Sequence, residues 1–127
     1  MQRTPGSAKT VKKSRLTGRK TLRPRVRALK LAREFRRRIS RELGLPVKVI
    51  MFGSQARGDA SRESDIDLLV ILPAIDNLMI QKASAIAWEV GFDAGKVLSV
   101  IPDTRENMKN YGFLPFYRSI REEGVAV

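Results

Sequence analysis

The chain has 127 residues, a net charge of +12, and neither cysteine nor histidine. This length suits one domain with a single modest hydrophobic core. Without Cys and His, disulfides, thiolate nucleophiles, imidazole bases and metal sites built on these ligands are all excluded. The apolar runs are too short to span a bilayer and the N-terminus lacks the apolar stretch of a secretory signal, so we expect a cytoplasmic protein.

Positive charge is concentrated in the first third of the chain. Residues 1–48 contain 17 Lys and Arg against 2 acids, whereas residues 49–127 contain 8 against 11. Lys and Arg gain affinity for nucleic acids by releasing counterions from the phosphates, so residues 1–48 could bind RNA or DNA. A solubilising basic segment without a specific partner explains the composition equally well.

Residues 1–22 have few apolar positions and no periodicity, which predicts a flexible basic arm ahead of a domain over residues 23–127. A helix is predicted from Pro24 to Gly44, because apolar residues recur every three or four positions and glycine ends the pattern. Arginines cover the rest of this helix. Its predicted apolar face consists of Ala28, Leu31, Phe35, Ile39 and Leu43.

Three apolar or β-branched runs predict strands at residues 47–52, 65–72 and 96–101. Glycine or proline follows each run, and Pro102 is expected to stop the third. Strands separated by helices predict an α/β or α+β fold, in which a small sheet is covered by helices.

Two further helices are predicted between and after these strands. The first is capped by Asp76 or Asn77 and ends at Gly91, and the second begins near Pro115 and ends at Gly124. The residues predicted to face inward are Met79, Ala83, Ile86, Ala87 and Val90 on the first, and Phe116, Tyr117 and Ile120 on the second.

Two aspartates stand where the second predicted strand begins. Residues two apart on a strand face the same side, so Asp65 and Asp67 would project together with about 6 to 7 Å between their Cα atoms. Like charges this close are costly unless a cation lies between them, and Mg²⁺ suits such a pair. For a short motif, a solvated strand end is the alternative. The apolar residues 68–72 favour the metal site, because the acids then stand at the entry to a buried strand.

The end of the first predicted strand carries residues suited to phosphate. Gly53 lets a phosphate approach the backbone closely, Ser54 adds a hydroxyl, and the start of a helix presents free N–H groups. Arg57, one helical turn later, either contacts phosphate oxygens with its planar guanidinium or is an exposed loop arginine.

The segment 52–58, followed by residues 64–70, resembles the DNA polymerase β-like nucleotidyltransferase superfamily, and in particular its minimal stand-alone members. The shared signature is Gly-Ser, ten intervening residues, and then Asp-Ile-Asp-Leu. A weaker likeness at residues 97–102 and 116–125 extends the resemblance to about residues 47–127.

The resemblance implies a mixed sheet with flanking helices and transfer of a nucleoside monophosphate from an NTP, with ATP the first candidate, to an acceptor hydroxyl or phosphate. By this likeness Gly53 and Ser54 bind the triphosphate, while Asp65 and Asp67 hold Mg²⁺. Such chemistry depends on positioning and charge neutralisation, so it needs neither histidine nor cysteine.

Active members of the superfamily carry a third carboxylate on a later strand, where this chain has Ser99. Serine cannot replace a carboxylate as ligand and base. Glu89, Asp93 or Asp103 could reach the site, but their spacing does not select one.

Three hypotheses follow, of which an active Mg²⁺-dependent nucleotidyltransferase is preferred. The second is a catalytically weakened nucleotide-binding antitoxin or adaptor that acts beside a HEPN-domain partner. The third is a nucleic-acid-binding module that uses the basic N-terminus. A minimal domain of this kind could also form a homo-oligomer.

Overall fold

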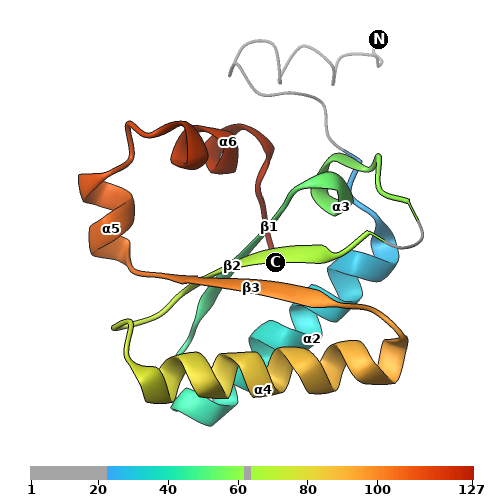
Figure 1. Cartoon of the computed structure of the whole chain (residues 1–127), viewed down its shortest axis with the longest axis horizontal. Helices are drawn as coiled ribbons and strands as arrows, with labels where there is room; N and C mark the ends of the chain where they lie inside the picture. Colours follow the sequence, from blue (N-terminus) through green and yellow to red (C-terminus); the bar gives the residue numbers. More distant parts are fainter. Residues whose placement is uncertain (1–22, 62–63) are drawn as a thin grey trace, which may run out of the picture.

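The computed structural model describes residues 23–61 and 64–127 (Figure 1), so the predicted arm at residues 1–22 lies outside the described residues. Within them, five helices and a four-stranded sheet form an α+β fold, as predicted. In chain order the elements are α2 (Val26–Leu43), β1 (Lys48–Phe52), α3 (Ser54–Arg57), β2 (Ile66–Ile71), α4 (Asn77–Ala94), β3 (Leu98–Asp103), α5 (Arg105–Asn110), α6 (Pro115–Glu123) and β4 (Val125–Ala126).

The sheet is mixed, with the strand order β3-β2-β1-β4. β1 is antiparallel to both β2 and β4, whereas β2 and β3 are parallel. The register places Asp67 of β2 between Phe52 of β1 and Ser99 of β3. Three segments that are far apart in the sequence therefore meet around Asp67.

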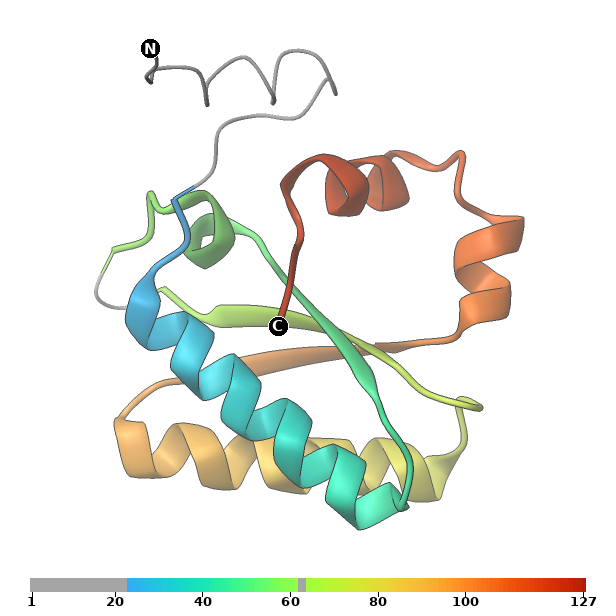
Figure 2. The ribbon, with the colours of Figure 1, turned by 180° about the vertical axis from the view of Figure 1, so that it is seen from behind.

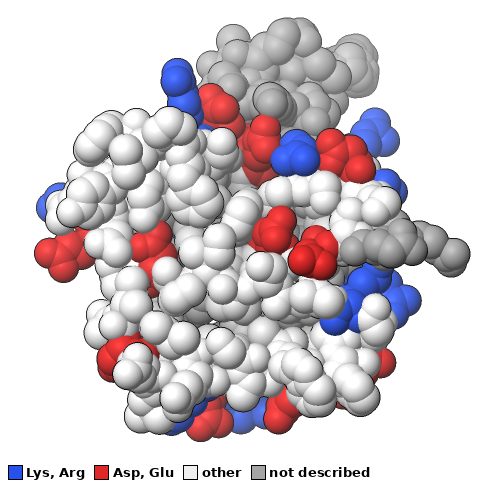
Figure 3. Space-filling view, viewed as in Figure 1, with Lys and Arg blue, Asp and Glu red and all other residues white. Residues whose placement is uncertain are grey.

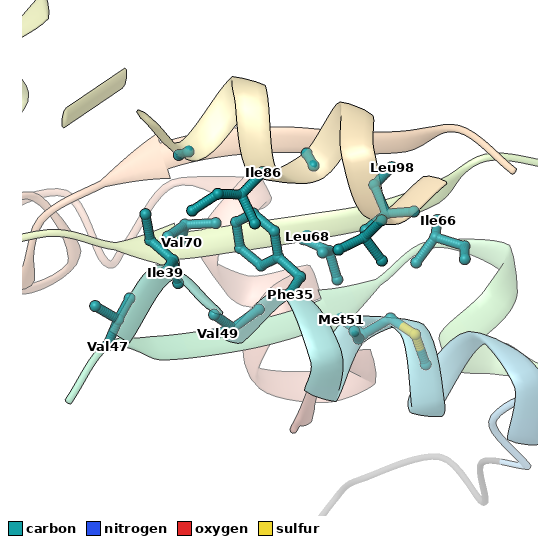
Figure 4. Packing of buried hydrophobic residues seen from close by; sticks show 14 of the residues in the cluster. Phe35, Ile39, Val47, Val49, Met51, Ile66, Leu68, Val70, Ile86 and Leu98 are labelled. Carbon is teal, nitrogen blue, oxygen red and sulfur yellow. The ribbon is translucent and has the colours of Figure 1, made fainter. Parts of the chain in front are cut away.

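Helices cover the two faces of the sheet unequally. α2 and α4 lie together on one face, where they bury the main core with residues such as Phe35, Leu68 and Ile86 (Figures 2 and 4). On the other face Ile120 of α6 packs in a smaller cluster that includes Leu69. Because side chains alternate along a strand, Asp67 lies on the same face of β2 as Leu69, beneath the α6 side of the molecule.

The predicted helices are present, and most of their predicted caps are confirmed. Gly44 ends α2 in the left-handed region at φ 69°, where its N–H donates to the Arg41 carbonyl. Asp76 caps α4 by accepting from the Met79 N–H at 2.9 Å. No helix in the described part of the chain is long and apolar enough to cross a membrane.

Two predicted boundaries are wrong. α4 continues through Gly91, which is needed for packing, since a Cβ there would lie 2.3 Å from the Lys96 carbonyl oxygen; Gly95 ends the helix instead. β3 continues through Pro102 to Asp103, which an edge strand tolerates because its outer side needs no N–H donor. The short elements α5 and β4 are not predicted from the sequence at all.

Candidate functional site

The turn after β1 brings the Gly53 backbone against the Asp67 side chain. Gly53 has φ 76° and ψ −159°, a conformation that residues with a Cβ rarely adopt. A Cβ built on Gly53 would lie 2.4 Å from Oδ2 of Asp67. Glycine is therefore required here both by the backbone conformation and by the carboxylate that lies over it. Ser54, the next residue, begins α3 and is half-buried beside this contact.

Asp65 and Asp67 flank the first residue of β2 and influence each other. Asp65 is exposed immediately before the strand, and Asp67 is half-buried within it. Burial raises the pKa of the Asp67 carboxyl, the negative charge of Asp65 raises it further, and Arg57 partly opposes both effects. A cation between the two carboxylates would relieve the unfavourable charge, in agreement with the reasoning from their spacing.

Ser99 occupies the position beside Asp67 on the neighbouring strand. None of the three acids considered from the sequence replaces the missing carboxylate. Glu89 lies on α4, across the sheet, with Oε1 3.7 Å from Nη1 of Arg38, and Asp93 is exposed on the same helix. Among the described residues no group of three or more acidic side chains is arranged to hold a metal ion.

Asp103, the remaining candidate, has a structural role. It lies four residues beyond Ser99 on β3, about 13 Å along the strand. Its buried carboxylate accepts hydrogen bonds from the Tyr117 hydroxyl at 2.6 Å and from the Thr104 N–H at 2.8 Å. The first of these bonds raises the pKa of Tyr117 to about 12. Asp103 thus attaches α6 to the end of β3 and does not approach the aspartate pair.

Arg57 is close enough to Asp67 to affect its pKa, but its guanidinium contacts other carboxylates. Nε lies 3.2 Å from Oδ2 of Asp59, and Nη1 lies 3.3 Å from Oε1 of Glu123 on α6. The predicted contact of Arg57 with phosphate therefore requires an exchange of partners. The sequence gives no signal for Glu123, because 66 residues separate it from Arg57.

The α6 side of the site is aromatic. The ring of Phe116 meets the ring of Phe52 edge-on, with 5.7 Å between their centroids, and 38% of Phe116 is exposed. Phe52 precedes Gly53, so an apolar wall adjoins the glycine turn. Figure 3 shows acidic side chains in the middle of this face, with uncharged surface around them, and a mixture of acidic and basic side chains along its upper margin.

The donors present suit Mg²⁺. This ion usually binds proteins through one or two carboxylates and completes its octahedron with waters and substrate phosphates. Asp65 and Asp67 provide two carboxylates, their charges disfavour each other without a cation, and the absence of a side chain at Gly53 lets the Asp67 carboxylate lie over that backbone. Together these groups can hold a metal-bound phosphate.

The chain matches a known protein family over most of its length. Residues 32–127 match the family model described as a nucleotidyltransferase domain. Over 77 residues the chain is 32% identical to the protein named "Putative protein adenylyltransferase MJ0604" of Methanocaldococcus jannaschii, an alignment that covers 61% of this chain and 73% of that protein.

Proposed function

The chain belongs to the nucleotidyltransferase domain family, and we propose that it transfers the adenosine monophosphate unit of ATP to an acceptor hydroxyl with the help of Mg²⁺. The observation that carries this proposal is the position of the Asp67 carboxylate over Gly53, where an added Cβ would lie 2.4 Å from Oδ2. It joins a metal-binding group to a turn that a phosphate can approach. The choice of ATP rests on the relative, whose name describes an adenylyltransferase.

Each residue of the site has a defined task in this proposal. Gly53 and Ser54 receive the triphosphate, with the backbone and the hydroxyl as its contacts. Asp65 and Asp67 would hold Mg²⁺, which when bound neutralises charge on the triphosphate and on the pyrophosphate that leaves. Phe52 and Phe116 present an apolar wall beside the turn, suited to the face of a nucleobase.

The acceptor oxygen attacks the α-phosphorus, the bond to the β-phosphate oxygen breaks, and the hydroxyl proton is lost to solvent. Ser99 stands where a carboxylate would take that proton. We therefore expect slow transfer that becomes faster as the pH rises, because the acceptor must lose its proton without an adjacent carboxylate.

The test is transfer of label from ATP that carries a labelled α-phosphate, with RNA and protein acceptors tried separately. Asp65→Asn and Asp67→Asn should each reduce transfer by about 100-fold or more, since each removes a metal ligand. Asp93→Asn makes the same chemical change on an exposed residue of α4 and should leave transfer unchanged. Undiminished transfer in both site variants would reject the proposed site.

Ser99→Asp provides a test in the opposite direction. It places a third carboxylate beside Asp67, and we expect faster transfer at neutral pH and a weaker dependence of the rate on pH. Ser99→Asn, which has similar size and no charge, is the control. If Ser99→Asp and Ser99→Asn behave alike, Ser99 does not mark the position of the missing base.

A further inference from the structure

The outer side of α2 carries a row of basic side chains, Lys30, Arg33, Arg37 and Arg41, which we call the α2 stripe. All four are exposed, and they lie opposite the residues that α2 buries, among them Phe35 and Ile39. Figure 2 shows α2 running along the outside of the molecule from the turn at α3 to the far end of the sheet. The α2 stripe is therefore exposed along the outer side of this helix.

The acids of α2 neutralise only one member of this row, Arg37. Glu34 pairs with Arg37 and Arg38, and Glu42 lies 3.4 Å from Lys82 of α4. In the part of the chain that the structure describes, the side chains of Lys30, Arg33 and Arg41 form no ion pair. Like charges four residues apart on a helix repel each other, so the stripe carries a cost that an anionic partner would relieve.

The spacing of the α2 stripe suits one strand of a nucleic acid. Its members are three or four residues apart, so the charges repeat about every 4.5 to 6 Å along the helix axis. The phosphates of one strand also recur at short, regular intervals, so successive side chains of the stripe can meet successive phosphates. Single-stranded loops and ends are the parts of RNA that proteins most often recognise.

The N-terminal end of the stripe adjoins a basic pocket. The chain just before α2 contacts the segment after Gly53: the Arg25 N–H donates to the Gln55 carbonyl at 3.0 Å, and Nη2 of Arg25 donates to the Ala60 carbonyl at 3.1 Å. A pocket of about 290 Å³ lies at this junction. Its lining includes three basic residues, Arg25, Arg27 and Lys96, together with Ile66, whose side chain lies on the α2 face of the sheet, opposite Asp67.

We propose that the α2 stripe binds the phosphate backbone of single-stranded RNA and that the strand continues into the basic pocket beside β2. The contacts are ion pairs between phosphates and Lys or Arg side chains, which read charge and spacing but not sequence. This interaction goes beyond the proposed nucleotidyl transfer and does not depend on it.

The test measures binding of fluorescently labelled oligouridylate to the full chain by anisotropy over a range of salt concentrations. The variant with Lys30→Gln, Arg33→Gln and Arg41→Gln should bind roughly 50-fold more weakly at physiological salt, and its salt slope should fall by about 2, because three phosphate contacts are lost. The control variant carries Lys48→Gln, Arg105→Gln and Lys109→Gln. It removes the same charge from exposed residues outside α2 and should bind as the unmodified protein does.

Three results would overturn the proposal. The first is absence of RNA binding by the unmodified protein, and the second is equal binding by the α2 variant, which would assign the affinity to another segment. The third is binding of oligodeoxyuridylate as tight as that of the RNA. Binding of ATP with Mg²⁺, measured on the same α2 variant by calorimetry, should be unchanged. If the unmodified protein does not bind ATP with Mg²⁺, the proposed function is rejected and the result for RNA is unaffected.

Discussion

Gly53 is the residue at which backbone conformation and site chemistry meet. Gly53→Ala would force a Cβ to within 2.4 Å of Oδ2 of Asp67 in a backbone region that alanine disfavours. We expect a loss of about 1 to 3 kcal/mol in the free energy of unfolding. We also expect loss of ATP binding in the presence of Mg²⁺, because the Asp67 carboxylate must move. Urea unfolding and calorimetry measure the two effects.

Gly95→Ala is the matched control for this change. Gly95 also has a positive φ, 66°, but nothing lies within 4 Å of a Cβ built there. It ends α4, which packs on the face of the sheet opposite Asp67, so the variant should lose stability without losing ATP affinity. ATP binding by Gly53→Ala at the level of the unmodified protein would show that the glycine turn is not part of the nucleotide site.

The raised pKa of Asp67 predicts that the stability of the metal-free protein depends on pH. Its pKa is raised in the folded protein, first by burial and then by Asp65, so its protonated form is the one that folding favours. That contribution is fully present below pH 3.8, the ordinary pKa of aspartate, and is lost as the pH rises through the raised pKa. Asp67→Asn should therefore raise the free energy of unfolding at neutral pH but not below pH 3.8.

In the presence of Mg²⁺ and ATP, the unmodified protein should become more stable than Asp67→Asn. The ligand stabilises only the protein that binds it, so the melting temperature should rise for the unmodified chain and stay constant for Asp67→Asn. Melting curves with ATP and either Mg²⁺ or a chelator measure this. An equal rise in both proteins would mean that Asp67 is not a ligand.

At the level of elements, the attachment of α6 to β3 depends on one hydrogen bond between side chains. Tyr117→Phe removes the donor to the Asp103 carboxylate, which is 4% exposed, and should cost about 1 to 3 kcal/mol of unfolding free energy. Tyr117 should lose its proton only at about pH 12, since the bond to Asp103 holds it. The stability that this bond provides is present below pH 10, the ordinary tyrosine pKa, and is lost through pH 12.

An ultraviolet titration of tyrosinate and urea unfolding measure the two consequences. The step at about pH 12 should be absent from Tyr117→Phe. Ser119→Ala changes an exposed hydroxyl on the same helix and serves as the control for stability. If Tyr117→Phe is as stable as the unmodified protein, the bond to Asp103 does not hold α6 in place.

Elements with a local signal are predictable, and elements defined by distant contacts are not. The apolar period and the glycine identify α2, and the prediction that Ala28, Phe35 and Ile39 are buried is confirmed. The prediction that Gly91 ends its helix is wrong. Gly91 lies inside α4, where the absence of a side chain lets the helix pack against the chain before β3. β4 has only two residues and is defined by its pairing with β1, so its own sequence contains no pattern that predicts a strand.

At the level of the whole molecule, the sheet separates the main hydrophobic core, which stabilises the fold, from the candidate site on its other face. Phe35 is fully buried between α2 and the sheet, on the face opposite Asp67. Phe35→Ala should cost about 3 to 5 kcal/mol of unfolding free energy by leaving a cavity. In the fraction that stays folded, the affinity for ATP should hardly change. Urea unfolding and calorimetry at low temperature measure both, and a large loss of affinity would show that the main core also shapes the site.

The same division explains how much of the site the sequence predicts. Asp65 and Asp67 are two residues apart around the start of β2, so their proximity follows from the alternation of side chains. The contact of Arg57 with Glu123 depends on how the last helix folds back over the sheet, and no local pattern encodes it. The roles of the predicted residues in binding ATP and Mg²⁺ stay predictions until the variants are measured.

The open side of β3 has a consequence for association between molecules. Hydrogen bonds from β2 reach the carbonyls of Val97 and Asp103, so alternate residues face β2 and Pro102 faces outward. Proline has no N–H, and a strand arriving from another molecule would find no donor at that position. An exposed strand without such an interruption acts as a template for fibril growth. Pro102 thus protects the sheet from extending into aggregates when the protein is concentrated.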